Sequence, residues 1–173
     1  EIVGVAAVEG AGHHELLRAL AGRLEPATGT LIRPASVGFI PEDRHREALI
    51  LDFSLTENVA LRGAGARRGS VDWRGTESRS RELLEAFDVR APSTTVSAST
   101  LSGGNQQKLV LGRWVNEARR PEVLLLDDPT QGVDAGARTE LYQALHGVAE
   151  RDGVAVLFAS SDPEEVVALA DRC

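Results

Sequence analysis

Apolar runs that alternate with helical patterns constrain the fold of this chain more than any other feature. Continuous apolar runs cover residues 2–8, 123–126 and 154–159, and a shorter one covers 37–40. Because their apolar residues are continuous rather than alternating, we expect strands buried on both faces, as in parallel sheets. Segments with helical patterns separate these runs along the chain. The sequence therefore predicts an α/β domain with a mainly parallel sheet.

Helices are predicted where apolar residues recur at helical spacing or where a capping pattern occurs. The predicted helices cover residues 15–22, 54–61, 76–87 and 135–150, with others starting at 105 and 162. Ser54 and Glu57 have the spacing of a capping box, and Pro163 suits the first turn of the last helix. Between the helices we expect a turn at 26–30 followed by a short strand, a loop rich in glycine and arginine at 62–69, and a polar linker at 91–100.

The composition limits the classes of protein to which the chain can belong. Its 173 residues suffice for one domain with a sizeable core. It has no apolar run of about 18 residues, the length that spans a bilayer. The net charge of −7 argues against a nucleic-acid groove as the main surface, and a single cysteine, Cys173, excludes an internal disulfide. The chain contains no methionine and starts inside an apolar run, so we expect it to be a piece of a longer polypeptide.

A glycine-containing loop links the first predicted strand to the first predicted helix. Strand, glycine-rich turn and helix are the context that a P-loop requires. Gly10 and Gly12 allow a nest of backbone amides, which favours phosphate. Of the two glycines in the pattern G-x-x-x-x-G-K-S/T, only the second matches, because Ala7 stands at the first position. A glycine turn that binds no ligand is the alternative interpretation.

The residues after Gly12 differ from that pattern in charge and in chemistry. His13 stands where a lysine would neutralise phosphate, and His14 stands where a hydroxyl would hold Mg²⁺. Glu15 adds a carboxylate to the first helical turn, which repels phosphate. The two histidines could suggest a metal site. We do not expect one, because neighbouring residues of a helix point in different directions and no third ligand lies at a metal-binding spacing.

The second motif is the string Leu101-Ser102-Gly103-Gly104-Asn105-Gln106-Gln107-Lys108. Ser102 is a good N-cap for the helix that follows, and the two glycines let the backbone approach another molecule closely. The exposed amides of a helix start favour anions, phosphate above all. A capped surface helix with a glycine-rich start is the alternative.

This string resembles the signature motif of ABC-type ATPases, in the form usual among importers of monosaccharides and nucleosides. Two further strings, Val8-Glu9-Gly10-Ala11-Gly12-His13-His14-Glu15-Leu16 and Pro41-Glu42-Asp43-Arg44, look like the second ATPase domain of tandem importers. The run 122–126 with its following acids resembles the Walker B strand; a strand capped by a polar turn is the alternative. The resemblance implies a P-loop NTPase-like core with a helical subdomain at about 54–115, and an antiparallel arm shortened near 30–37.

The resemblance also implies roles for particular residues. It assigns to the chain's own nucleotide loop Gly10, Ala11, Gly12, His13, His14 and Glu15. It assigns to the signature, which serves ATP on a partner domain, Leu101, Ser102, Gly103, Gly104 and Gln106. Asp127 would hold Mg²⁺, Asp134 belongs to the D-loop, and the catalytic positions are those of Asp128, Ser161 and Glu42. At all three catalytic positions the residue differs from the family's usual glutamate, histidine and glutamine.

The function implied is that of an ATPase domain of an importer, with ATP and Mg²⁺ as cofactors and a weak site of its own. The implied partners are a first nucleotide-binding domain of the same polypeptide, transmembrane permease subunits and, indirectly, a solute-binding protein, with no nucleic acid. The implied location is the cytoplasmic face of the membrane. The alternatives are a soluble ABC ATPase that works on ribosomes or DNA, and an interaction module that no longer binds nucleotide.

Overall fold

A computed structural model describes residues 1–62, 69–115 and 120–173 of the chain. The chain divides into two compact units, each with its own internal contacts. Unit 1 comprises Glu1–Glu42, Arg120–Gln131 and Tyr142–Cys173, and unit 2 comprises Asp43–Arg119 and Gly132–Leu141. Most of the predicted loop 62–69 lies outside the described residues.

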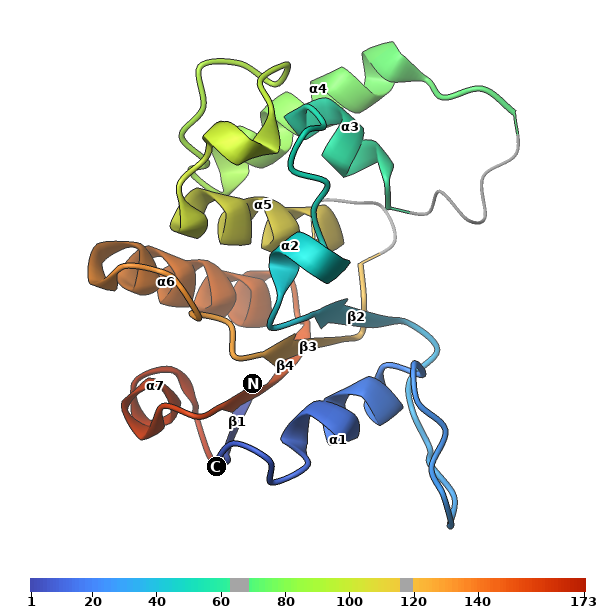
Figure 1. The fold of residues 1–173 in the computed structure, drawn as a ribbon, viewed down its shortest axis with the longest axis vertical. Helices are drawn as coiled ribbons and strands as arrows, with labels where there is room; N and C mark the ends of the chain where they lie inside the picture. Colours follow the sequence, from blue (N-terminus) through green and yellow to red (C-terminus); the bar gives the residue numbers. More distant parts are fainter. Residues whose placement is uncertain (63–68, 116–119) are drawn as a thin grey trace. The chain divides into compact units, whose positions relative to one another are not determined.

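Unit 1 contains a four-stranded sheet in the order β1-β4-β3-β2, and every neighbouring pair is parallel. Its strands are β1 (Ile2–Ala6), β2 (Val37–Ile40), β3 (Val123–Asp127) and β4 (Ala155–Ser160). Its helices are α1 (His13–Leu20), α7 (Pro163–Leu169) and the later part of α6 (Ala135–Arg151). The predicted α/β class and the parallel sheet are confirmed (Figure 1).

The core of unit 1 forms where α1 packs on the sheet. Leu17 of α1 lies in one buried cluster with Phe39 of β2, Leu125 of β3 and Ala159 of β4. On β1, an added Cβ at Gly4 would lie 2.9 Å from a side-chain carbon of Val166, so the glycine allows α7 to approach the strand closely. The continuous apolar runs are therefore buried by helices, as their pattern predicts.

The parallel register brings the carboxyl ends of the strands to one edge of the sheet. Ala6 of β1 pairs with Ser160 of β4, and Asp127 of β3 pairs with Ala159 of β4. The loops after these strands therefore start side by side, at the edge where open α/β sheets bind their ligands. The predicted site residues of unit 1 lie at, or in the loops and helix start after, the carboxyl ends of β1, β2, β3 and β4.

Unit 2 is mainly helical. It contains α2 (Arg44–Glu47), α3 (Leu55–Ala60), α4 (Trp73–Ala86), the 3₁₀ turn η2 (Ala98–Thr100), α5 (Gly103–Val115) and the first residues of α6. Ser54 caps α3: its Oγ accepts from the Glu57 backbone N–H, and Glu57 reaches back to the Ser54 N–H. The predicted capping box is therefore confirmed.

A buried amide side chain organises the segment before α3. Asn58 is fully buried; its Nδ2 donates to the carbonyls of Ile50, Phe53 and Ser54, and its Oδ1 accepts from the Ile50 N–H at 2.9 Å. Arg113 of α5 donates to the Asn58 carbonyl at 3.0 Å. Burial, together with the nearby positive charge of a second arginine, lowers the pKa of Arg113 to about 10, so it stays charged at neutral pH.

Replacing Asn58 with alanine is expected to lower the free energy of unfolding by about 2–4 kcal/mol, because buried backbone groups lose their partners. Gln143→Ala, at an exposed position of α6, is the matched control and should change it by less than about 0.5 kcal/mol. Urea denaturation of both variants measures the difference. A loss below about 1 kcal/mol for Asn58→Ala would mean that water replaces the lost bonds.

Two predictions about secondary structure need correction. The short strand expected after residue 30 is absent, since residues 21–36, all described, form no strand. Pro34 has no N–H for a ladder, and Ile32 is 91% exposed instead of packing on a neighbour. Helix α4 begins earlier than predicted, because Asp72 caps it by accepting from the Gly75 N–H.

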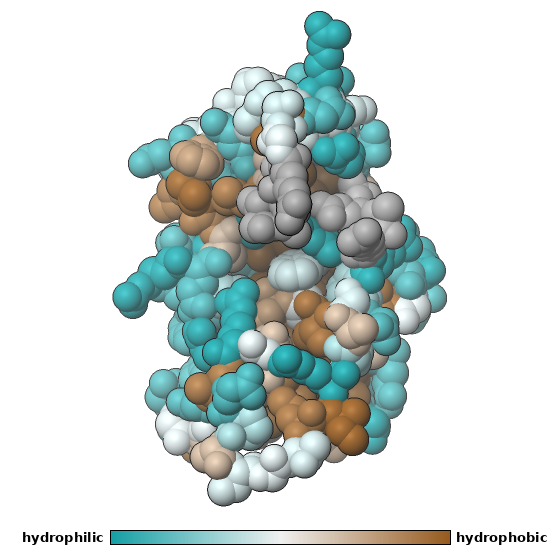
Figure 2. Space-filling view, turned by 90° about the vertical axis from the view of Figure 1, so that its right-hand side faces the viewer, coloured by the Kyte–Doolittle hydropathy of each residue, from teal (hydrophilic) through white to brown (hydrophobic). Residues whose placement is uncertain are grey.

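The described surface mixes polar and apolar groups. On the face that Figure 2 shows, hydrophobic side chains form small areas separated by hydrophilic ones. Among the described residues, every helix is too short or too polar to cross a membrane.

Candidate functional site

The loop after β1 turns sharply before α1 begins. Gly10 and Gly12 have φ values of 78° and 91°, in the left-handed region that favours glycine. Helix α1 then starts at His13, directly after Gly12. The loop thus presents the first turn of a helix at the carboxyl edge of the sheet. Glu15 lies in that first turn and is exposed.

The two histidines at the start of α1 converge, which corrects the prediction that they point apart. Their ring centroids lie 3.9 Å from each other. His14 Nδ1 lies 2.7 Å from Asp127 Oδ1, and His13 Nε2 lies 3.8 Å from Asp128 Oδ2. Partners that the sequence separates by 113 positions are neighbours here, because β1 and β3 both end at this edge.

Asp128 connects the histidines to the end of β4. Its Oδ1 accepts from the backbone N–H of Ser161 at 2.9 Å and from the Ser161 hydroxyl at 3.1 Å. Its Oδ2 faces His13, and its own φ is 42°. Both carboxylate oxygens of Asp128 thus lie next to polar groups of unit 1, Oδ1 beside Ser161 and Oδ2 beside His13.

Glu42, which follows β2, completes the acidic group at this edge. Gln131 Nε2 donates to Glu42 Oε1 at 2.7 Å, while Glu42 Oε2 lies 3.9 Å from His14 Nε2. His14 therefore lies between two carboxylates, those of Asp127 and Glu42.

These contacts shift the pKa values of two groups. Partial burial opposes a charge on the ring of His14, but the hydrogen bond and charge of Asp127, with the other nearby carboxylates, raise the pKa of His14 above its usual value. Burial raises the pKa of Asp127, although its bond to His14 acts in the opposite direction. The two side chains are thus close enough to shift each other's pKa.

The signature string lies in unit 2, at the start of α5. Ser102 is exposed, and its Oγ accepts from the backbone N–H of Asn105 at 3.4 Å, as expected of an N-cap. Packing within unit 2 also requires glycine at positions 103 and 104. An added Cβ at Gly104 would lie 2.4 Å from Ala137 Cβ, and one at Gly103 would lie 2.7 Å from the Gly132 carbonyl oxygen.

The polar residues that follow the glycines hold α5 in place within unit 2. Gln106 is 6% exposed; its Oε1 accepts from His45 Nε2 at 2.8 Å, and its Nε2 donates to the carbonyl of Ala98 at 3.2 Å. Lys108 Nζ donates to Glu140 Oε2 at 2.9 Å. Gln106, assigned by resemblance to a partner's ATP, therefore directs its side chain inward.

A small pocket of about 190 Å³ lies beside the start of α5. Ser102, Gly104 and Asp134 line it, together with Arg90 and Glu140. Asp134 also caps α6, since its Oδ1 accepts from the Ala137 N–H. The structure thus brings the signature residues and the predicted D-loop residue to one place in unit 2. Leu101 is buried below them.

Comparison with known proteins identifies the family of the chain. The profile of the family described as ABC transporter matches residues 1–131. The chain belongs to the ABC transporter family. A nucleoside import ATP-binding protein, NupA of Lactococcus lactis subsp. cremoris, is 38% identical over 99% of this chain and 37% of its own length. A ribose import ATP-binding protein, RbsA of Corynebacterium glutamicum, is 40% identical over 99% of this chain and 35% of its own length.

Solved ABC structures confirm the architecture. The cassette MJ0796, bound to ADP and Pi in a dimeric post-hydrolysis state, has a TM-score of 0.73 at 24% identity over 95% of this chain and 75% of its own. CbiO1 of Clostridium perfringens, part of an ABC transporter complex, has a TM-score of 0.77 at 21% identity. The match covers 99% of this chain and 71% of CbiO1. The chain spans somewhat more than a third of the length of the curated relatives that it matches.

Within this ABC domain, the predicted residues fall into two groups, one in each unit. Around the loop of unit 1 the structure gathers Gly10, Ala11, Gly12, His13, His14, Glu15, Glu42, Asp127, Asp128 and Ser161. Around the start of α5 in unit 2 it gathers Leu101, Ser102, Gly103, Gly104, Gln106 and Asp134. Sequence reasoning missed Gln131, His45 and Glu140 as partners, because each bonds to a residue far away in the chain.

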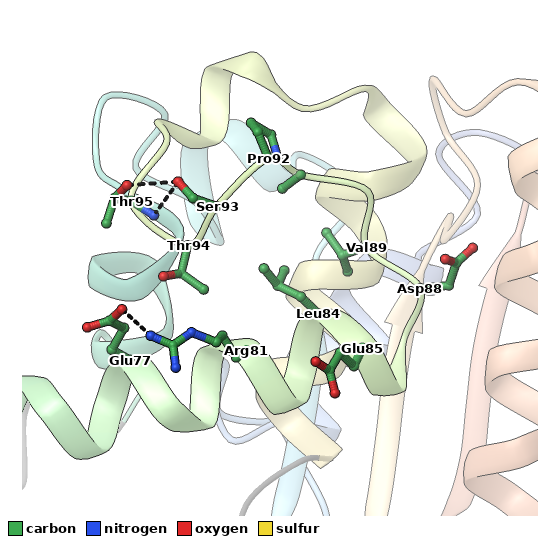
Figure 3. Close-up of a pocket in the computed structure, with 11 residues that line it drawn as sticks. Glu77, Arg81, Leu84, Glu85, Asp88, Val89, Pro92, Ser93, Thr94 and Thr95 are labelled. Atoms are coloured by element: carbon green, nitrogen blue, oxygen red, sulfur yellow. Dashed lines mark hydrogen bonds and ion pairs between the residues drawn. The ribbon is translucent and has the colours of Figure 1, made fainter.

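The ABC domain also has a larger pocket, of about 530 Å³, between α4 and the segment 88–95 in unit 2 (Figure 3). Leu84, Val89 and Pro92 give it an apolar wall, and Arg81 at its rim donates to Glu77 Oε1 at 2.6 Å. Its acidic side chains make it a poor match for phosphate.

Proposed function

We propose that this chain is an ATP-binding domain of an importer for sugars or nucleosides. The relatives' functions, ribose import and nucleoside import, support this solute class. In this proposal the signature segment at Ser102 closes over ATP held by a partner, the first nucleotide-binding domain of the same polypeptide. The share of the relatives' length that the chain spans fits a tandem arrangement.

The chain's own loop fits Mg²⁺-ATP poorly, and one contact supports this most directly. His14 Nδ1 lies 2.7 Å from Asp127 Oδ1, so the imidazole contacts the carboxylate that would otherwise hold Mg²⁺. His13 supplies no fixed positive charge, and Glu42 and Asp128 add negative charge around the phosphate position. Phosphoryl transfer depends on charge compensation and positioning, which these residues do not provide. We therefore infer weak binding and little hydrolysis in this loop.

The signature segment suits the role of a cap. Its exposed serine and the amides at the start of α5 present hydrogen-bond donors and the positive end of a helix dipole. The bonds of Gln106 and Lys108 fix the helix, so these donors are positioned before a phosphate arrives. ATP supplies the phosphoryl group; this chain's residues bind and orient it.

The partners proposed with this function are transmembrane permease subunits and, through them, a solute-binding protein. The domain would lie at the cytoplasmic face of the membrane.

Titrating the isolated chain with labelled ATP and Mg²⁺ tests the asymmetry. We expect half-saturation in the millimolar range and no measurable turnover, because the loop lacks charge compensation. The full tandem protein is the control and should bind ATP tightly at its first domain. Micromolar affinity with turnover in the isolated chain would contradict the proposal.

A further inference from the structure

We propose that His13, His14, Asp127 and Asp128, here called the His–Asp cluster, bind a divalent transition-metal ion such as Zn²⁺. Each side chain offers one ligand atom, and these atoms all lie within 4.8 Å of one another. The cluster joins the start of α1 to the end of β3 within unit 1. The inference rests on this cluster alone and holds whether or not the chain serves an importer.

The ligand set determines the class of metal. Two imidazole nitrogens and two carboxylate oxygens suit Zn²⁺ and its neighbours among the transition metals, which bind nitrogen well. Mg²⁺ and Ca²⁺ prefer sites built from oxygen. The cluster is therefore a poor site for the Mg²⁺ that accompanies ATP and a good one for zinc.

His13 gives an independent reason to expect a ligand. Its residue is 4% exposed, and neither ring nitrogen has a hydrogen-bond partner among the described residues. Burying such polar atoms without a partner costs free energy. A metal ion between His13 Nε2 and Asp128 Oδ2, which lie 3.8 Å apart, would satisfy one nitrogen.

The surrounding residues orient the ligands as supporting residues do in known metal sites. Ser161 donates twice to Asp128 Oδ1, which leaves Oδ2 directed to His13. The second nitrogen of His14, Nε2, faces Glu42 Oε2 at 3.9 Å, and Gln131 fixes Glu42. A carboxylate behind a histidine ligand fixes its tautomer and ring orientation.

The distances need only small adjustments. Tetrahedral zinc with bonds of 2.0–2.1 Å separates its ligand atoms by about 3.3 Å. The present separations lie on both sides of that value, from 2.7 Å for His14 and Asp127 up to 4.8 Å. Rotation of the side chains can bring them to it. The bound ion would then lie between His14 and Asp127, and it would occupy the carboxylate that Mg²⁺-ATP requires.

The full-length protein, treated with a chelator and dialysed, tests the inference by titration with Zn²⁺ and with Co²⁺. We expect one Zn²⁺ site that His14→Gln weakens at least about 100-fold. Co²⁺ should give the intense visible absorption of a tetrahedral site, and His14→Gln should abolish it. His146→Gln and Cys173→Ser, which remove the other histidine and the cysteine of unit 1, are the controls and should retain both signals.

Two results would overturn the inference: equal Zn²⁺ affinity in the unchanged protein and His14→Gln, or displacement of Co²⁺ by millimolar Mg²⁺. Circular dichroism shows whether His14→Gln folds. If it does not, thermal unfolding of the unchanged protein decides, because a bound ion stabilises the folded state. Zn²⁺ should raise the Tm of unit 1 by several degrees, and an unchanged Tm would overturn the inference.

Discussion

Replacing Ser102 with aspartate is expected to lower the ATPase rate of the full-length protein by about 100-fold or more. The substitution places a negative charge where the signature would face the phosphates of a partner's ATP, and loss of one such donor alone costs about 100-fold or more. Aspartate caps a helix as well as serine does, so α5 should remain intact. The rate of phosphate release at saturating ATP measures the effect.

The matched variant is Ser102→Asn, which also caps the helix but carries no charge. We expect it to lose less than about tenfold, because the asparagine amide can still donate to a phosphate and adds no charge. Ser70→Asp puts the same charge at another exposed position of unit 2 and should leave the rate unchanged. Equal losses for Ser102→Asp and Ser102→Asn would show that the size of the side chain, and not its charge, causes the loss. Unchanged rates in both variants would show that Ser102 takes no part in ATP hydrolysis.

Ser102 is a better position for this test than the neighbouring glycines. An added Cβ at Gly104 would lie 2.4 Å from Ala137 Cβ of the same unit. A loss of activity in Gly104→Ala would therefore have a cause inside unit 2, without any nucleotide. The sequence could not show this, because the contact joins α5 to a segment about thirty residues later.

The fold was predictable because its signals are local. Continuous apolar runs indicated buried parallel strands, and the Ser54 capping box indicated the start of α3. The strand expected after residue 30 was wrong because an apolar pair such as Leu31-Ile32 indicates a strand only where a neighbour pairs with it. Helix α4 was predicted too short because its first residues, from Trp73 after the cap Asp72, lie outside the apolar pattern of the later turns.

The site was predictable in its membership but not in its contacts. Motif positions identified His14 and Asp127, and strand ends explained why they share an edge. The bond between them depends on side-chain directions that helical periodicity describes only for residues on one helix. That is why the convergence of His13 and His14 on Asp127 and Asp128 was missed. The same limit hid the contact of Lys108 with Glu140, which joins α5 to α6.

The double substitution His13→Lys with His14→Ser is expected to raise the affinity of the isolated chain for Mg²⁺-ATP by about 10- to 100-fold. A lysine at the start of α1 adds a charged hydrogen bond to phosphate, worth about 1.5–3 kcal/mol, and 1.4 kcal/mol corresponds to tenfold. Serine at position 14 removes the imidazole that now occupies Asp127 and offers a hydroxyl to Mg²⁺. Titration with labelled ATP at constant Mg²⁺ measures the change.

His146→Lys is the control, because it makes the same kind of charge change in α6 and should leave the affinity as it was. Turnover should stay low in the double variant, since Asp128 and Ser161 still occupy the catalytic positions and remain bonded to each other. A gain in ATP affinity without a gain in turnover would therefore show that His13 and His14 limit binding but not hydrolysis. No gain in affinity would mean that the backbone of the loop, with its glycines at 10 and 12, is the limiting element instead of the histidines.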